Sequence, residues 1–255
     1  MSDHLPLLER LHHLHRAWRY RLRSERDELA FMRRCDLAGR TAIDIGAHRG
    51  IYSWWMHKAV GPTGRVVAFE PQPEMQAYLQ RMKQSFHLDR LAIEPCAVSS
   101  APGRTRLVRE AGHSGGARLD PTGAIAHRAT AAGATATLET LDVSITTLDE
   151  YFAAHPGPPV AFIKCDVEGH ELAVFEGGRR LLERDRPALL VEVHDRRVRE
   201  GSLFRLLGEL GYDAFFPHRG RLVPMTEFDA LRPEIDKAYL NYLFRPAERG
   251  AERER

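Results

Sequence analysis

Short apolar runs alternate with segments of helical periodicity from Thr41 onward. The apolar runs predict strands, at residues 41–46, 65–70, 91–98, 160–166, 187–194, 212–217 and 238–244. The segments between them predict helices, at residues 51–60, 73–84, 171–184 and 202–210, with a further short helix that begins at 146–150. Strands that alternate with helices predict an α/β domain, in which a parallel sheet is covered by helices on both faces. Such a sheet binds ligands at the edge where the carboxyl ends of its strands meet.

Residues 1–34 follow a helical pattern of their own. Apolar side chains recur there at spacings of three and four residues, and they predict a stripe made of Leu5, Leu8, Leu11, Leu14 and Trp18. Histidine and arginine occupy much of the remaining helix surface. We expect this helical extension to pack its stripe against the main domain. The alternative is a basic lid or a docking arm for an anionic partner.

The main domain is expected at residues 35–246, followed by a charged tail at 247–255. Within the domain, residues 99–145 are rich in Gly, Ala and Thr and include the run Gly112-His113-Ser114-Gly115-Gly116. A long segment without regular structure in a compact domain usually serves a function or is disordered. We therefore expect an insertion made of a hairpin and a mobile loop.

Composition and charge exclude several classes of protein. The 255 residues carry a net charge of +2, and this near-neutral balance disfavours a dedicated nucleic-acid-binding protein. The three cysteines, Cys35, Cys96 and Cys165, form no Cys-x-x-Cys pair, which disfavours a disulfide framework or a structural zinc site. No apolar run approaches the ~20 residues that span a bilayer, and the N-terminus lacks the features of a signal peptide. We expect a cytoplasmic protein with no membrane partner and no nucleic-acid partner.

A glycine loop follows the first predicted strand, in the order Asp44-Ile45-Gly46-Ala47-His48-Arg49-Gly50, and precedes a predicted helix. Gly46 allows a sharp turn and the close approach of a ligand to the main chain, and Gly50 allows the helix to begin near the strand. The free N–H groups at the start of that helix suit a carboxylate or a phosphate. Glu70 ends the second strand, where an acid can accept hydrogen bonds from both hydroxyls of a ribose. Together these features predict a site for a cofactor that contains a nucleoside.

Two cofactors fit this arrangement, and residue 48 discriminates between them. A dinucleotide site favours Gly-x-Gly-x-x-Gly because the pyrophosphate approaches the backbone, and His48 would crowd that approach. S-adenosylmethionine has no pyrophosphate, and its ammonium and sulfonium groups suit the nearby Asp44. We therefore favour S-adenosylmethionine. Asp44 also fits a purely structural role in bracing the loop, and Glu70, which precedes Pro71, fits a role as a capping or turn residue.

Further segments carry a more specific signal because they occur together and in order. They lie at residues 61–71, 96–99, 147–150, 186–187 and 191–194, and at Ile163-Lys164-Cys165-Asp166-Val167-Glu168-Gly169-His170-Glu171. With the glycine loop, they resemble the FkbM-type methyltransferase family from about residue 28 to residue 244. The resemblance implies a Rossmann-like class I methyltransferase sheet of seven strands, mostly parallel, with an antiparallel last strand. It also implies methyl transfer from S-adenosylmethionine to a hydroxyl group of a sugar, a glycoside or a natural product.

The same resemblance implies a set of cofactor-binding residues, namely Asp44, Gly46, Ala47, His48, Gly50, Glu70, Pro71, Ala97 and Asp166. Family members often have Asn where this chain has His48. The stretch from Glu110 to Val143 matches no family pattern, and substrate choice resides in such loops. We therefore expect a small-molecule or glycan acceptor without identifying it, and the oligomeric state stays open.

Catalytic candidates lie at the carboxyl ends of the fourth and fifth predicted strands. Asp166 and Glu168 share one face by two-residue spacing, as do Glu192 and His194. A hydroxyl acceptor must lose its proton, which a base or an electrostatic partner assists. We select Asp166, Glu192 and His194, because an unpaired acid in an apolar run is costly and imidazole titrates nearest to neutral pH. Lys164 is the expected structural partner of Glu192.

Structural roles and other functions compete with this interpretation. Asp166 and Glu168 also suit the capping of the helix that begins near His170, and a histidine at an exposed strand end is common. Asp166, Glu192 and His194 would also suit a divalent metal, but their spacing matches no metal signature, and we predict no metal. Two other functions stay open. One is a methyltransferase for nucleic acid or protein, which the missing Asn/Asp-Pro-Pro-aromatic tetrapeptide disfavours, and the other is a cofactor-binding module without catalysis.

Overall fold

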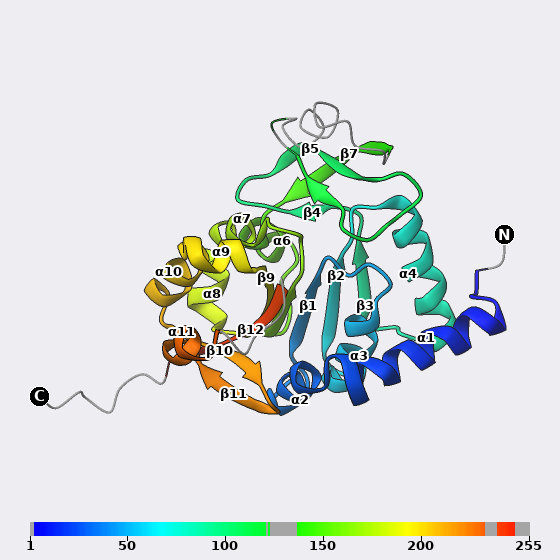
Figure 1. Cartoon of the computed structure of the whole chain (residues 1–255). Helices are drawn as coiled ribbons and strands as arrows, with labels where there is room; N and C mark the ends of the chain where they lie inside the picture. The colour runs from blue at the N-terminus through cyan, green and yellow to red at the C-terminus, as the bar shows by residue number, and fades with distance from the viewer. Residues whose placement is uncertain (1–2, 121, 123–136, 233–238, 248–255) are drawn as a thin grey trace, which may run out of the picture.

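The computed structural model describes residues 3–120, 122, 137–232 and 239–247, and its main sheet has the strand order β11-β10-β12-β9-β8-β1-β2-β3 (Figure 1). The strands are β1 (Thr41–Ile45), β2 (Arg65–Phe69), β3 (Leu91–Glu94), β8 (Val160–Cys165), β9 (Ala188–His194), β10 (Tyr212–His218), β11 (Arg221–Pro224) and β12 (Tyr239–Pro246). Five neighbouring strands, from β3 to β9, run parallel. β12 is antiparallel to both of its neighbours, β9 and β10. The predicted α/β class, the mostly parallel sheet and the antiparallel last strand are confirmed.

The predicted count of seven strands is wrong, because the main sheet has eight. The additional strand is β11, which pairs with β10 as an antiparallel hairpin. The two residues between these strands, Arg219 and Gly220, have φ angles of 49° and 76°. Positive φ at both central residues is the geometry of a two-residue hairpin turn. β11 therefore extends the sheet at one edge.

Helices cover both faces of the main sheet, as predicted. Four of them lie on one face: α1 (Leu7–Arg19), α2 (Arg26–Arg34), α3 (Ile51–Val60) and α4 (Pro73–Phe86). The other face carries α6 (Leu148–Ala154), α7 (Glu171–Glu176), α8 (Arg179–Asp185) and α10 (Ser202–Glu209). Successive side chains of a strand point to opposite faces, so Ala42 packs in the core beneath α3 and Ile43 packs in the core beneath α6. The remaining helical segments are η1 (Tyr20–Ser24), α9 (Asp195–Glu200), η2 (Met225–Glu227) and α11 (Phe228–Leu231).

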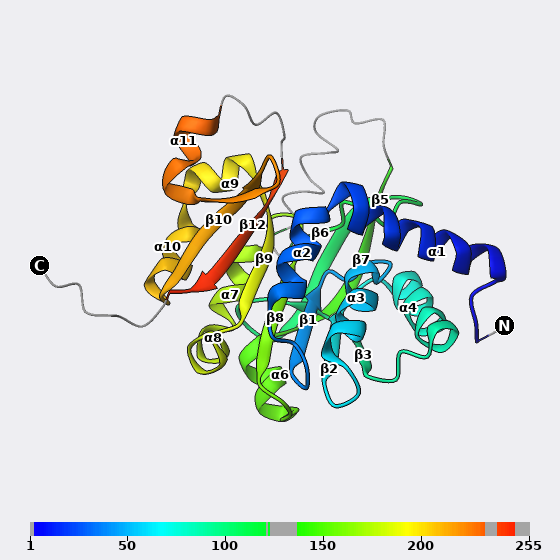
Figure 2. The ribbon, with the colours of Figure 1, turned by 90° about the horizontal axis from the view of Figure 1, so that it is seen from below.

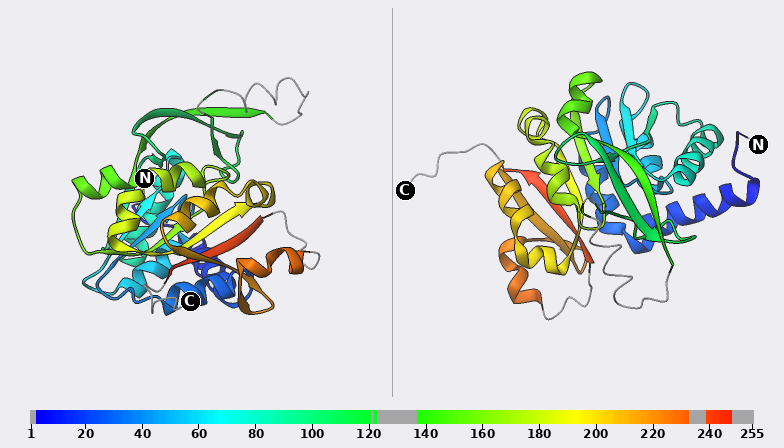
Figure 3. Two further views of the ribbon diagram at one scale, coloured as in Figure 1. Left: turned by 90° about the vertical axis from the view of Figure 1, so that its left-hand side faces the viewer. Right: turned by 90° about the horizontal axis from the view of Figure 1, so that it is seen from above.

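A second sheet lies as a separate layer over one end of the main sheet (Figure 3). Its strands are β4 (Ala97–Val98), β7 (Leu138–Thr146), β5 (Gly103–Glu110) and β6 (Arg118–Leu119), in that order. The single strand predicted at 91–98 is therefore wrong, since its first half is β3 of the main sheet and its second half is β4 of this one. The hairpin predicted in the insertion corresponds to the antiparallel pair β5 and β7. Residues 121 and 123–136 of the predicted mobile loop lie outside the described residues, as do 248–255 of the predicted tail.

The helix predicted at 171–184 is divided into α7 and α8 at Gly177 and Gly178. A Cβ atom at Gly177 would overlap the carbonyl oxygen of Ser99, and one at Gly178 would lie 2.9 Å from Leu148 Cδ1. The break thus allows the chain after β4 and the start of α6 to approach the helix pair. The helix predicted from 146–150 is confirmed as α6, and Thr147 Oγ1 caps it by accepting a hydrogen bond from the N–H of Glu150 at 3.0 Å.

The N-terminal extension is helical, and α1 packs across α3 (Figure 2). Its contact face is centred on His13 and Ala17, which are 2% and 0% exposed. The absence of a long side chain at Ala17 allows Trp55 to approach, and Trp55 Nε1 donates a hydrogen bond to the carbonyl oxygen of Ala17 at 3.2 Å. His13 Nδ1 lies 3.2 Å from the hydroxyl oxygen of Tyr78 in α4.

The apolar stripe of the N-terminal extension, which we predicted to be buried against the main domain, is only partly buried. Leu5 is 3% exposed, but Leu8, Leu11 and Trp18 are 65%, 53% and 46% exposed. The helix is rotated so that His13 and Ala17 meet the two tryptophans of α3, and Leu8 and Leu11 turn outward while Leu14 packs against the core. Within the part of the chain that the structure describes, no helix combines the length and the apolar character needed to cross a membrane.

Candidate active site

Gly46 lies immediately after β1, where the chain after β8 approaches it closely. Its φ is 75°, and a Cβ atom there would overlap the carbonyl oxygen of Asp166. Glycine is therefore required both by the left-handed backbone and by the neighbouring strand end. The same contact brings Asp166 beside the glycine loop, although 120 positions separate the two residues.

Asp44 braces the loop against α3 and still offers one oxygen. Its side chain is buried, and Oδ2 accepts hydrogen bonds from the N–H and the hydroxyl of Ser53 at 2.9 and 2.6 Å. Burial raises the pKa of Asp44, and the charge of Lys164 opposes that change. The second oxygen, Oδ1, is buried and has no hydrogen-bond partner among the described residues. A buried acceptor without a partner is costly, so Asp44 fits the ammonium group of a cofactor.

Gly50 acts on the site through packing. It has a φ of 69°, and a Cβ atom would lie 2.6 Å from Leu79 Cδ2 and 2.7 Å from Met82 Cε, both in α4. Gly50 lines neither of the two cavities described below, and it allows α3 to begin close to α4.

Glu70 follows β2 and is bonded to two backbone N–H groups. Its Oε2 accepts from the N–H of His48 at 2.7 Å, and its Oε1 accepts from the N–H of Gln72 at 2.9 Å. The carboxyl group is 2% exposed, and burial raises its pKa while these two hydrogen bonds oppose that change. Each oxygen keeps a lone pair for a further donor. Glu70 is thus held in one orientation with capacity for a diol such as a ribose.

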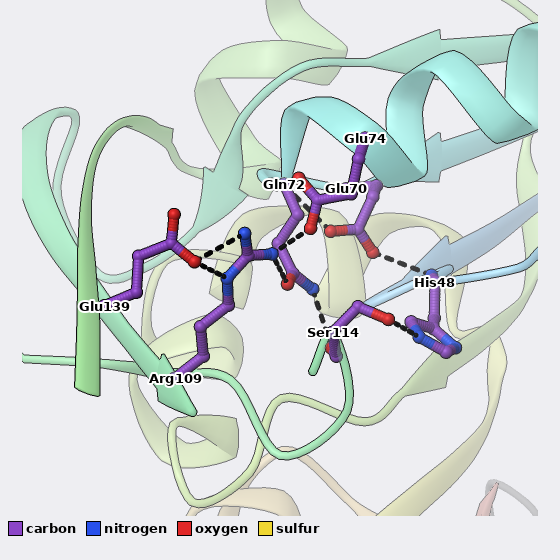
Figure 4. A network of polar contacts seen from close by, with 7 residues as sticks. All are labelled: His48, Glu70, Gln72, Glu74, Arg109, Ser114 and Glu139. Carbon is purple, nitrogen blue, oxygen red and sulfur yellow. Dashed lines mark hydrogen bonds and ion pairs between the residues drawn. The ribbon is translucent and has the colours of Figure 1, made fainter. Parts of the chain in front are cut away.

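The second sheet is fastened to this region by a polar network (Figure 4). Arg109 of β5 forms ion pairs with Glu74 and Glu139 and donates a hydrogen bond to Gln72 Oε1 at 2.6 Å. Gln72 Nε2 then donates to the carbonyl oxygen of Ser114 at 3.0 Å. The segment predicted to be a mobile loop is therefore bonded in place at Ser114. The hydroxyl of Ser114 also lies 2.8 Å from His48 Nε2.

The first cavity, of about 180 Å³, lies between the glycine loop, Glu70 and the second sheet. Six of the nine predicted cofactor residues line it: Gly46, His48, Glu70, Pro71, Ala97 and Asp166. Its apolar wall is formed by Phe69, Val98, Leu107 and Leu119. A planar base and a ribose suit such a combination of an apolar wall and a fixed carboxylate.

The second cavity, of about 130 Å³, adjoins the first and shares Gly46, His48 and Asp166 with it. Predicted residues Asp44, Ala47 and Glu192 also line it. The other lining residues come from the N-terminal extension, the glycine loop, α3 and the ends of β8 and β12; they are Arg16, Tyr20, Glu25, Arg49, Ile51, Tyr52, Lys164 and Asn241.

Glu192 and Asp166 meet at the second cavity because β8 and β9 are parallel neighbours. Lys164 Nζ lies 3.0 Å from Asp166 Oδ2, so the expected structural partner of Glu192 is paired with Asp166 instead. Burial, and then the charge of Asp166, raises the pKa of Glu192 to about 7. Burial also lowers the pKa of Lys164, but the nearby carboxylates of Asp166 and Asp44 outweigh it and raise that pKa overall. The arrangement provides one carboxyl group that titrates near neutral pH beside an ion pair.

His194 lies apart from this group. It lines neither cavity, and its Nε2 is 3.9 Å from Glu168 Oε2. Glu168 has a φ of 52° and lines the first cavity. Among the described residues, no group of three or more His, Cys, Asp or Glu side chains is arranged to hold a metal ion.

Several lining residues were not predicted from the sequence. Leu107 and Leu119 belong to the second sheet, and Gln72 and Ser114 are brought together by Arg109. The one local signal was the glycine-rich run around Ser114, which indicated a loop without indicating what it contacts.

A glycine loop and an acid that face one cavity at the carboxyl edge of a parallel sheet define a protein that binds a nucleoside cofactor. The family model for the methyltransferase FkbM domain matches residues 44–242. This chain belongs to the FkbM methyltransferase family, and its cofactor is S-adenosylmethionine.

Among solved structures, the methyltransferase FkbM from Methylobacillus flagellatus KT is 17% identical, with a TM-score of 0.49. The alignment covers 80% of this chain and 43% of that one, so this chain spans less than half of that protein's length. A candidate rRNA methylase from Clostridium thermocellum is 9% identical, with a TM-score of 0.52, and the alignment covers 88% of this chain and 95% of that one. At these identities, the likeness shows the fold alone. No match was found among curated proteins.

Proposed function

We propose that this protein is an O-methyltransferase that acts on a hydroxyl group of a small-molecule or glycan acceptor. The observation that carries the proposal is Glu192, a carboxyl group with a pKa of about 7 in a cavity that adjoins the cofactor site. A hydroxyl acceptor needs a base, and a base is most effective when its pKa lies near the working pH. All three cysteines are unpaired thiols, which suits a reducing compartment such as the cytoplasm.

The first cavity supports a defined placement of the cofactor. Glu70 would hold the ribose, and the apolar wall that includes Val98 and Leu107 would hold the adenine. Asp44 Oδ1, which lines the second cavity where it adjoins the first at Gly46, would accept from the ammonium group. When bound, S-adenosylmethionine supplies the methyl group. Asp166 lines both cavities and thus marks where cofactor and acceptor would meet.

We assign different roles towards the acceptor to Glu192 and Asp166, which both line the second cavity. Glu192 takes the proton of the hydroxyl group as the proposed base. Asp166, fixed by Lys164 at 3.0 Å, orients the acceptor. His194 lines neither cavity, so we assign it no contact with the reacting atoms. Holding the two reactants in line contributes on the order of 7–11 kcal/mol to lowering the barrier.

The test is methyl transfer from labelled S-adenosylmethionine to a panel of sugars, glycosides and hydroxylated natural products. Glu192→Gln should lower kcat by roughly 10²–10⁴-fold, the usual contribution of a general base, while the affinity for S-adenosylhomocysteine changes by less than about twofold. His194→Gln is the matched comparison on the same strand and should keep most of the activity. Full activity in Glu192→Gln, or an equal loss in His194→Gln, would contradict the assignment of the base.

A further inference from the structure

A basic groove opens beyond the second cavity, between α1, the glycine loop and α4. It has a volume of about 330 Å³, and its cationic residues are Arg16, Arg19 and Arg49, with His12 and His15 beside them. Glu9 is the one acidic residue among those that line it. The groove is therefore strongly biased towards positive charge, although the whole chain is close to neutral.

The groove and the second cavity share Arg16 and Arg49, and the second cavity in turn shares Gly46 and His48 with the first. The three spaces thus adjoin one another, in the order first cavity, second cavity and groove. An acceptor whose hydroxyl group lies beside Glu192 would extend the rest of its structure towards the groove. The residues of the groove are consequently placed to select the acceptor.

Among the described residues, the three arginines of the groove form no ion pair with an acidic side chain, whereas Arg109 and Arg184 each do. The guanidinium of Arg49 lies over the ring of Tyr78, 5.3 Å from its centroid, which holds it in the groove. A fixed guanidinium without a carboxylate is a ready donor for a phosphate, which it binds by two parallel hydrogen bonds.

The positive charges of Arg16 and Arg49 also help to lower the pKa of two nearby histidines. Burial, and after it the charges of Arg16 and Arg49, lowers the pKa of His13 and of His48 to about 4. Both imidazoles are therefore neutral at pH 7. The positive potential of the groove comes from the arginines and extends to the glycine loop.

We propose that the basic groove binds a phosphate or pyrophosphate group of the acceptor, so that the substrate class is a phosphorylated hydroxyl compound such as a sugar phosphate. The proposal rests on the O-methyltransferase function proposed above. The other anion that could reach these arginines is the carboxylate of the cofactor itself, and the experiment separates the two sources. A substitution of Arg19 distinguishes a phosphate of the acceptor from the carboxylate of the cofactor, because Arg19 lines the groove but not the second cavity.

The experiment is calorimetry with inorganic pyrophosphate as the probe, on the full chain, with and without saturating S-adenosylhomocysteine. We expect pyrophosphate to bind the wild type, and Arg19→Gln and Arg49→Gln to weaken it about tenfold or more. Arg19→Gln, whose side chain lines the groove but not the second cavity, should keep its affinity for S-adenosylhomocysteine within about twofold. The matched control is Arg179→Gln, which removes an exposed arginine of α8 on the opposite face of the sheet and should change neither affinity.

Three results would overturn the proposal. The first is the absence of pyrophosphate binding to the wild type. The second is a loss of S-adenosylhomocysteine affinity in Arg19→Gln as large as the loss for pyrophosphate, which would assign the groove to the cofactor carboxylate. The third is an equal loss of pyrophosphate binding in Arg179→Gln, which would indicate attraction by net charge alone. If S-adenosylhomocysteine does not bind the wild type, the proposed function fails, and the pyrophosphate titration without it still reports on the groove.

Discussion

The two cavities that meet at Gly46 and His48 differ in how the carboxyl groups of Glu70 and Asp44 are paired. In the first, both oxygens of Glu70 accept backbone hydrogen bonds, and Arg109 links three side chains. In the second, Asp44 Oδ1 has no partner among the described residues, and Glu192 has a raised pKa. The first cavity is thus preorganised for a ligand that does not vary. In the second, Asp44 Oδ1 is left for the ammonium group of the cofactor, and Glu192 is left for the hydroxyl group of the acceptor, which must be deprotonated.

The largest expected effect on stability is that of a substitution at Gly46, which lines both cavities. Gly46→Ala would force a left-handed alanine, at a cost of about 1–2 kcal/mol, and would displace the carbonyl oxygen of Asp166, at a further cost of about 1–3 kcal/mol. We expect a loss of roughly 2–5 kcal/mol in the free energy of unfolding, measured by urea denaturation. Gly201→Ala is the control, because its backbone is also left-handed (φ 74°, ψ −1°) and the nearest atom to a Cβ there would be the carbonyl oxygen of Val198, at 3.9 Å. Equal losses in the two variants would mean that the approach of Asp166 does not matter.

The pH dependence of the reaction tests the second cavity alone. Because the pKa of Glu192 is raised from 4.5 to about 7, its charged, basic form is depleted as the pH falls through 7. We expect kcat/KM to decrease about tenfold per pH unit below pH 7, and to level off above it, since kcat/KM reports the ionisation of the free enzyme. The affinity for S-adenosylhomocysteine, measured over the same range, should not follow this curve. A flat rate profile between pH 5 and 8 would contradict the role of Glu192.

A smaller effect is expected at Arg109, which tests the first cavity alone. Arg109→Met keeps the apolar stem but removes the ion pairs and the hydrogen bond to Gln72, so the segment at Ser114 loses its anchor. We expect a decrease in S-adenosylhomocysteine affinity of about 5–10-fold, which corresponds to roughly 1 kcal/mol for the loss of a typical hydrogen bond. Arg104→Met, at an exposed position of the same strand, is the control and should bind like the wild type.

Local sequence patterns predicted the elements whose structure is set by nearby residues. The strand at 41–46, the helix at 51–60 and the Thr147 cap all correspond to the structure, because apolar runs, glycines and capping hydroxyls act over a few residues. The glycine loop and Glu70 were placed at one cavity by the same reasoning. Parallel neighbours β8 and β9 brought Asp166 and Glu192 together. The two-residue spacing also placed Glu168 and His194 on the same faces, but neither of them lines the second cavity.

The parts that sequence reasoning missed depend on contacts between distant residues. Nothing near Arg109 indicates that it reaches Gln72, 37 positions away. The orientation of α1 depends on how Trp55 meets Ala17, and the leucine pattern alone predicted burial for Leu8, Leu11 and Trp18, which are exposed. The division of the helix at Gly177 depends on the carbonyl oxygen of Ser99, which belongs to a different layer of the fold.

The most direct test of the account is calorimetric binding of S-adenosylhomocysteine to the wild type and to Glu70→Gln, with Glu209→Gln, on an exposed position of α10, as the control. The account predicts that the wild type and the control bind with the same affinity. Glu70→Gln should bind more weakly by about 1–3 kcal/mol, the value of hydrogen bonds to a charged group. Its thermal unfolding should be measured in parallel, because Glu70 also accepts two backbone hydrogen bonds. A wild type that does not bind, or a folded Glu70→Gln variant that binds as tightly as the wild type, would contradict the placement of the cofactor.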